Sequence, residues 1–173
     1  MANPGASVSR TPADIVFDAF FLAGFGGSMV GLFFLVIDVS NGQPFFTPSL
    51  LGSVLFGGAA AETVAEVSME MAAYYTIVHF ATFGALGLGV AFLVHEVELH
   101  ARHTALVLLL LFIGFELAFV LGASILMPGV IETLGALQVG EANLLAAASM
   151  ALFLLASHRP DLWQRLRHAA HLG

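Results

Sequence analysis

Four long apolar stretches divide the chain, and its polar and charged residues are concentrated between them. The stretches cover about residues 14–38, 74–94, 104–127 and 135–157. Each has about the 20 residues that a helix needs to cross ~30 Å of hydrocarbon. Because short connections join the last three stretches, consecutive helices are expected to run antiparallel. The pattern predicts an all-α integral membrane protein, an up-and-down bundle of four transmembrane helices forming one domain over residues 1–173.

The positive charges indicate an orientation for these helices. The five Arg residues fall before the first stretch, between the second and third, or after the fourth: Arg10, Arg102, Arg159, Arg165 and Arg167. The other two connections, residues 39–73 and 128–134, contain neither Lys nor Arg. Cytoplasmic loops of membrane proteins hold an excess of Lys and Arg. Both termini are therefore expected on the cytoplasmic side.

The outer segment, residues 39–73, is longer than a simple connection. Thr47 and Pro48 have the pattern of a helix N-cap and first helical residue, and the apolar residues after them are too few to span. We expect a short interfacial helix here, between the first and second spans. Strong helix formers over residues 59–73 predict a second helix that leads into the second span.

Three acidic residues recur along this second outer helix. Glu62, Glu66 and Glu70 have the i, i+4, i+8 spacing that places side chains on one helical face. Like charges at this spacing repel each other, so an isolated helix gains nothing from them. The acidic outer face is either a solvated extension of the second span or a docking face for a cationic partner or a divalent ion.

Polar residues within the apolar stretches are the main candidates for a functional site. His79, Glu116 and Asn143 lie in segments that otherwise belong in hydrocarbon, where a charged group costs at least ~2.5–3.5 kcal/mol. All three fall in the outer half of the bundle or near its midplane, so they are expected to meet as an intramembrane polar cluster. The cluster is either a hydrogen-bonded network that fixes helix register, or a proton or substrate relay.

The cluster also bears on cofactors. The other His residues lie at the cytoplasmic side, so a haem held by two His residues of one subunit is disfavoured. His79 alone leaves open a chlorin or haem with a single His ligand, and a bound lipid is equally compatible with the pattern. The sequence does not establish any cofactor.

A second group of potential ligands lies at the cytoplasmic side. Its members have spacings that can place imidazole and carboxylate groups on one helical face: Glu96, His100, His103, His168 and His171. Such groups suit zinc or iron. The alternative is an interfacial role beside Arg residues at the lipid headgroups.

Small residues within the spans predict close helix packing. Gly24, Gly27, Ser28 and Gly31 give overlapping small-xxx-small steps in the first span. The second span has similar small positions at Gly84, Gly87 and Gly89. Such positions let helix backbones approach each other, either within the bundle or between subunits.

The composition excludes several classes of protein. The 173 residues are 59% hydrophobic and only 10% charged, whereas soluble domains carry about 25% charged residues. The chain has no Cys, which excludes disulfides and thiolate metal sites. Although the formal net charge is −7, no basic surface for nucleic acid is evident. The N-terminal residues lack a secretory cleavage pattern, so the first apolar stretch is expected to be retained as a span.

Several short motifs resemble a group of uncharacterised small four-helix proteins of the bacterial inner membrane. They are GQPFFTPSLLG at residues 42–52, YTIVHF at 75–80, FE at 115–116, NLLA at 143–146 and HRP at 158–160. The resemblance implies a bacterial four-span protein and singles out the outer segment, His79, Glu116 and Asn143. It implies no activity. The Glu-rich stretch at residues 60–71 is longer than this group leads us to expect, which leaves open a specialised outer contact.

Three functions are compatible with these observations. The first is a non-enzymatic accessory or structural subunit of a larger energy-converting or transport complex, in contact with lipids and with other subunits or copies of itself. The second is a small homo-oligomeric transporter or channel with a proton-coupled path through His79 and Glu116. The third is a membrane enzyme with a cytoplasm-facing metal site. The size of the chain and its small-residue faces favour the first.

Overall fold

The computed structural model of the chain describes residues 12–96 and 104–158, and all of the regular secondary structure in these two segments is helical. This confirms the all-α part of the predicted fold class. The elements are α1 (Pro12–Ser40), α2 (Phe46–Gly57), the 3-10 helix η1 (Ala61–Thr63), α3 (Met69–Glu96), α4 (Thr104–Leu126), α5 (Val130–Leu134) and α6 (Ala136–His158). The four longest helices begin and end within about five residues of the four predicted apolar stretches.

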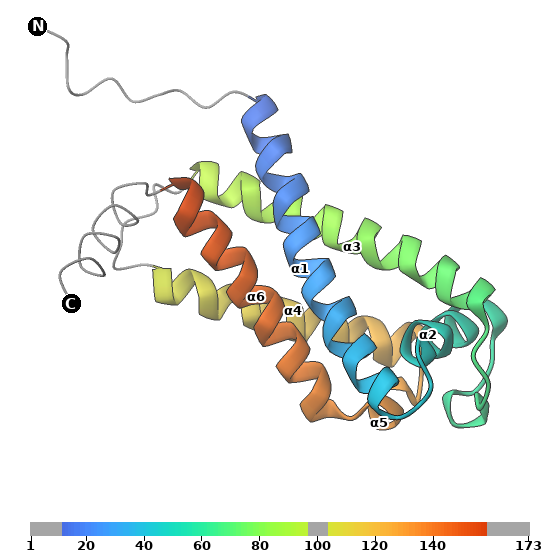
Figure 1. The fold of residues 1–173 in the computed structure, drawn as a ribbon. Helices are drawn as coiled ribbons and strands as arrows, with labels where there is room; N and C mark the ends of the chain where they lie inside the picture. Colours follow the sequence, from blue (N-terminus) through green and yellow to red (C-terminus); the bar gives the residue numbers. More distant parts are fainter. Residues whose placement is uncertain (1–11, 97–103, 159–173) are drawn as a thin grey trace, which may run out of the picture.

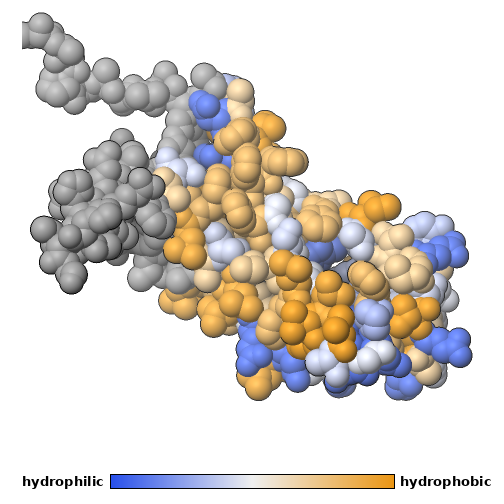
Figure 2. Space-filling view, in the orientation of Figure 1, coloured by the Kyte–Doolittle hydropathy of each residue, from blue (hydrophilic) through white to orange (hydrophobic). Residues whose placement is uncertain are grey.

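Three of the described helices, α1, α3 and α6, are long and apolar enough to cross a membrane. The third apolar stretch forms α4, a helix of 23 residues. Large apolar side chains point outward rather than into a core: Phe20 on α1 is 74% exposed and Ile125 on α4 is 76% exposed. Figure 2 shows apolar surface over the middle of the molecule, hydrophilic residues along its lower edge and right-hand side, and a few more near the start of α1. This distribution is that of a protein with lipid as its solvent.

The long helices run between two ends of the molecule (Figure 1). Helices α2 and α5 lie at the end where α1 finishes and α3 begins, and the start of α1 and the end of α6 lie at the other. Among the described residues, α1 packs against α3 and α6, α4 packs against α6, and α2 packs against α3. The consecutive helices α3 and α4 are not a packed pair, unlike the neighbours expected from a simple up-and-down bundle. Helices α1 and α6 connect them instead.

Glycine residues allow α1 and α3 to approach closely. A Cβ atom built on Gly87 of α3 would lie 2.6 Å from the backbone oxygen of Ala19, and one on Gly26 of α1 would lie 2.7 Å from Met150 Sδ. A backbone atom cannot move aside alone, so Gly87 sets the separation of α1 and α3, whereas Gly26 leaves room for the Met150 side chain of α6. The buried side chains of Leu22 and Phe83 complete the core between α1, α3 and α6.

Helix α2 begins differently from the prediction. We expected Thr47 as N-cap, but the helix starts at Phe46 and the cap position is Phe45, in the left-handed conformation with φ of 68°. Thr47 therefore lies inside the first turn, where its backbone N–H needs an external acceptor. Asp38 of α1 supplies that acceptor. The helix ends in the usual way, at Gly58 with φ of 65° and its N–H bonded to the Ser53 carbonyl.

The predicted helix over residues 59–73 does not form, so the three glutamates share no helical face. Glu62 lies in η1, Glu66 in the following irregular segment and Glu70 in the first turn of α3, and all three are exposed. Ser68 ends the irregular segment because its hydroxyl caps α3, accepting from the Met71 N–H at 3.4 Å. The Ser68 N–H in turn donates to the buried hydroxyl of Ser49 on α2 at 2.7 Å.

Helix α5 is an element that the sequence pattern did not reveal. Its five residues lie between Gly129 and Gly135, which both have positive φ. Val130 anchors this turn because it is fully buried in a second core with Leu50 and Met127. This core joins α2 to the end of α4 and is separate from the core between α1, α3 and α6.

Candidate functional site

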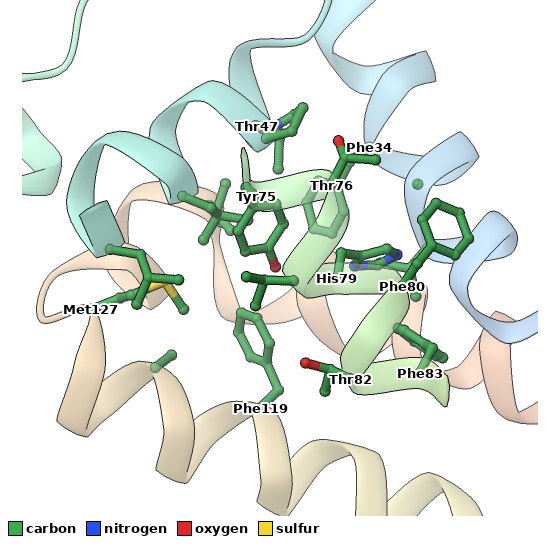
Figure 3. A pocket seen from close by; sticks show the side chains of 18 of the residues that line it. Phe34, Thr47, Tyr75, Thr76, His79, Phe80, Thr82, Phe83, Phe119 and Met127 are labelled. Atoms are coloured by element: carbon green, nitrogen blue, oxygen red, sulfur yellow. The ribbon is translucent and has the colours of Figure 1, made fainter. Parts of the chain in front are cut away.

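A cavity of about 390 Å³ lies between the two cores. Residues of α1, α2, α3 and α4 form most of its wall, and α5 and α6 contribute Leu134 and Asn143. Figure 3 shows Tyr75 of α3 and Phe119 of α4 pointing into it from opposite sides. The cavity occupies the space in which α3 and α4 would otherwise pack against each other. Its lining is mostly apolar, so its few polar groups determine what it can recognise.

Two of these polar groups satisfy each other. The Thr47 N–H donates to Asp38 Oδ2 at 2.8 Å, and the Thr47 hydroxyl donates to Asp38 Oδ1, also at 2.8 Å. Both residues are buried, and Asp38 is only 3% exposed. The carboxyl group thus compensates for the loss of water at the first turn of α2. We infer that Asp38 and Thr47 stabilise the fold at the outer end of the bundle and take no part in binding or catalysis.

The histidine of the predicted polar cluster also has a structural partner. The Nε2–H of His79 donates to the backbone carbonyl of Gly27 on α1 at 2.9 Å. Gly27 also leaves room for the neighbouring Phe80 of α3, since a Cβ there would lie 3.1 Å from the Phe80 ring. The aromatic rings of Tyr75, Phe80 and Phe83 surround the imidazole, with centroids 6.0, 5.3 and 4.9 Å away. In this arrangement Nε2 is not available as the axial ligand of a pigment.

Asn143 differs from His79 in this respect. It lines the cavity from α6 and is only 7% exposed, and its buried Nδ2 has no hydrogen-bond partner among the described residues. A buried amide N–H without an acceptor costs about 1–3 kcal/mol, which makes such groups rare in native structures. Among the polar groups that line the cavity, the Asn143 amide is therefore the one that most clearly needs a hydrogen-bond acceptor.

Glu116 lies apart from the cavity wall. It is half-buried on α4, where its Oε1 faces Gly140 of α6, 3.1 Å from where a Cβ of that glycine would be. Gly140 precedes Asn143 by three residues, about one helical turn. The structure thus brings His79 and Asn143 to one cavity and places Glu116 beside it at the contact of α4 and α6. Among the described residues, the hydrogen bond of His79 goes to the α1 backbone and to neither of the other two.

The remaining predicted site residues lie elsewhere. Glu70 accepts a hydrogen bond from the Tyr74 hydroxyl at 2.9 Å, within its own helix. Of the proposed metal ligands, His100, His103, His168 and His171 lie outside the described residues, and Glu96 is the last residue of α3. Within the described segments, no three His, Asp or Glu residues are arranged to hold a metal ion.

Sequence reasoning missed Asp38, Tyr75 and Gly27 as site residues. In the sequence, Asp38 stands only at the end of the first apolar stretch, and Tyr75 only as the first residue of the YTIVHF motif. Gly27 acts through its backbone carbonyl, which carries no side-chain signal. The nearest indication in the sequence was the series of small residues in the first span, because close helix approach exposes backbone oxygens to a neighbouring helix.

Comparison of the chain with protein-family models, with curated proteins and with solved structures finds no significant match. Functional inference therefore depends on the residues and their geometry.

Proposed function

We propose that the protein is a four-span integral membrane protein of the bacterial inner membrane with both termini in the cytoplasm. Helices α1, α3, α4 and α6 are the spans, and α2, η1 and α5 form the outer end. The length and hydropathy of α1, α3 and α6 support this placement, as do the apolar sequence of α4 and the restriction of Arg to the opposite connections and ends.

Within that membrane we infer a non-enzymatic role, as an accessory or structural subunit of a larger energy-converting or transport complex. One face of α3 carries the argument. Ala81, Ala85 and Gly89 follow each other at intervals of four residues and are all exposed. A Cβ on Gly89 would meet nothing within 4 Å. A small-xxx-small series is how transmembrane helices approach one another, because it lets backbones come close.

The occupant of this face is a transmembrane helix of another subunit. Lipid chains gain nothing from a small-residue groove that they do not gain from a Leu-rich surface, whereas a helix gains extensive van der Waals contact. The proton-coupled path has no comparable support, since His79 is bonded to Gly27 and Glu116 lies against Gly140.

The test is the mass and composition of the native particle. The protein is tagged at its own locus, extracted in mild detergent and compared with the 18.2 kDa expected of the chain alone. We expect a defined complex with other membrane proteins, and loss of these partners with Ala85→Leu. Ala156→Leu, the same change at an exposed alanine of α6, is the matched control and keeps the complex intact. A monomer or a homo-oligomer contradicts the proposal.

A further inference from the structure

The cavity between α3 and α4 contains polar groups that the protein itself leaves unsatisfied. The amide of Asn143 is more than nine-tenths buried and lines the cavity, and within the described segments its Nδ2 has no partner. A half turn about χ2 exchanges the N–H and C=O ends of such an amide at nearly the same positions. Asn143 can therefore present an N–H donor to a molecule in the cavity.

Tyr75 of α3 provides a second donor in the lining of the same cavity. Its hydroxyl makes no hydrogen bond with the described residues, and Figure 3 shows it directed into the cavity. Tyr75 is six residues from the start of α3 and Asn143 is seven from the start of α6. At 1.5 Å per residue, both lie roughly 9–10 Å inside the outer ends of their helices. Two donors in the lining of one cavity favour an occupant with acceptor oxygens.

The shape of the lining indicates the rest of that occupant. Phe34, Phe83 and Phe119 supply aromatic surface, while Gly122 and Ala123 leave a smooth wall on α4. Phenyl groups from α1, α3 and α4 suit a flat ring, which stacks on them or makes edge contacts with them, and the two small residues leave room beside Phe119. The volume of about 390 Å³ falls within the range of roughly 300–1,000 Å³ that is typical of small-molecule sites.

We propose that this cavity binds a lipid-soluble molecule with a flat, carbonyl-bearing ring, of the quinone class, and that Asn143 donates a hydrogen bond to a ring carbonyl. The ester carbonyls of phospholipids are the competing acceptors. They lie near the edge of the ~30 Å hydrocarbon layer, whereas Asn143 lies several ångströms deeper in the four-span placement. A ring carbonyl reaches that depth with its apolar body still in hydrocarbon.

This inference rests on the four-span placement but not on the identity of any partner subunit. The helix-packing face of α3 consists of Ala81, Ala85 and Gly89, none of which lines the cavity. Loss of the complex is measured with Ala85→Leu, and loss of ligand binding in the cavity is measured with other variants. The two proposals can therefore fail independently.

Two glycines of α4 provide a matched pair for the test. A Cβ on Gly122 or on Gly114 would meet nothing within 4 Å, so a side chain can leave the backbone without a clash at either position. Gly122 lines the cavity and Gly114 does not. Gly122→Leu should fill the cavity without disturbing the fold, while Gly114→Leu adds the same side chain elsewhere. Asn143→Leu removes the proposed hydrogen bond.

The measurement is saturable binding of a radiolabelled decyl-substituted 1,4-benzoquinone to the purified full-length protein in mild detergent, with unlabelled benzoquinone or a short-chain phosphatidylcholine as competitor. We expect about one site per chain. Asn143→Leu should weaken binding roughly 3- to 10-fold, the effect of one hydrogen bond, and Gly122→Leu by more than roughly 10-fold. Gly114→Leu should bind like the wild type.

Three results would overturn the proposal. The first is no saturable binding of the benzoquinone by the wild type. The second is an equal loss in Gly114→Leu and Gly122→Leu, which would mean that binding does not occur in the cavity. The third is competition by phosphatidylcholine as effective as that by unlabelled benzoquinone, which would assign the cavity to lipid chains.

Discussion

Asp38 at the end of α1 holds the first turn of α2 by accepting two hydrogen bonds from Thr47, one from its backbone N–H and one from its hydroxyl, each 2.8 Å long. The two residues are nine positions apart in the sequence, and both are buried. The contact fixes the chain reversal at the outer end of the bundle. It also explains how α2 begins without a side-chain cap of its own.

Asp38→Asn should destabilise the protein by about 1–3 kcal/mol, because an amide offers one acceptor oxygen and leaves one of the two Thr47 donors buried without a partner. Thermal unfolding in detergent measures the effect. Ser40→Ala, which removes an exposed hydroxyl bonded to the Ile37 carbonyl, should change stability by less than about 0.5 kcal/mol. Equal effects of the two substitutions would show that the Asp38 contact contributes little.

Ser49 and Ser68 should stabilise the junction of α2 and α3 in a similar way. Ser49→Ala removes the buried acceptor of the Ser68 N–H, so we expect a loss of about 1–3 kcal/mol. The segment around η1 should also become more susceptible to limited proteolysis. Ser53→Ala, at a half-buried serine of the same helix, is the control. Unchanged proteolysis of the Ser49 variant would argue against this junction.

The close contact of α1 and α3 predicts opposite outcomes at two neighbouring glycines. Gly87→Ala would place a Cβ 2.6 Å from the Ala19 carbonyl oxygen, a backbone atom that cannot move aside alone. We expect about 1–3 kcal/mol of destabilisation from the resulting overpacking. Gly89→Ala enters open space and should leave thermal stability unchanged or slightly raised. A stable Gly87 variant would mean that the two helices are farther apart.

His79 and Glu116 should behave as independent residues. His79→Phe loses the hydrogen bond to Gly27, at about 0.5–1.5 kcal/mol, and Glu116→Gln changes a group beside Gly140. Because they share no partner, the double variant should equal the sum of the single variants within about 0.5 kcal/mol. A coupling energy well above that value would show that His79 and Glu116 interact, as the sequence predicted.

The helices themselves could be predicted because apolar length is a strong signal, and α1, α3, α4 and α6 follow the four apolar stretches closely. The outer segment could not, since its structure depends on contacts distant in sequence. Asp38 replaces the expected cap of α2. A serine pair, rather than helix propensity, decides where α3 begins, so residues 59–68 are mostly irregular despite their helix-forming composition.

Part of the candidate site could also be predicted from the apolar stretches. His79 and Asn143 stand out because polar residues are rare in apolar stretches. Their surroundings depend on tertiary packing: α3 and α4 do not pack together, and the cavity lies in the space between them. No sequence pattern indicated that gap, nor that Tyr75 would point into it.

Both the helix-packing face of α3 and the depth of Asn143 depend on four spans with the outer end outside the cytoplasm. The chain has no Cys, so single cysteines can be introduced and labelled in intact cells with a membrane-impermeant maleimide. Glu66→Cys and Glu132→Cys should react directly, and Arg102→Cys only after permeabilisation. Labelling of the Glu66 and Glu132 positions from opposite sides of the membrane would contradict the four-span placement.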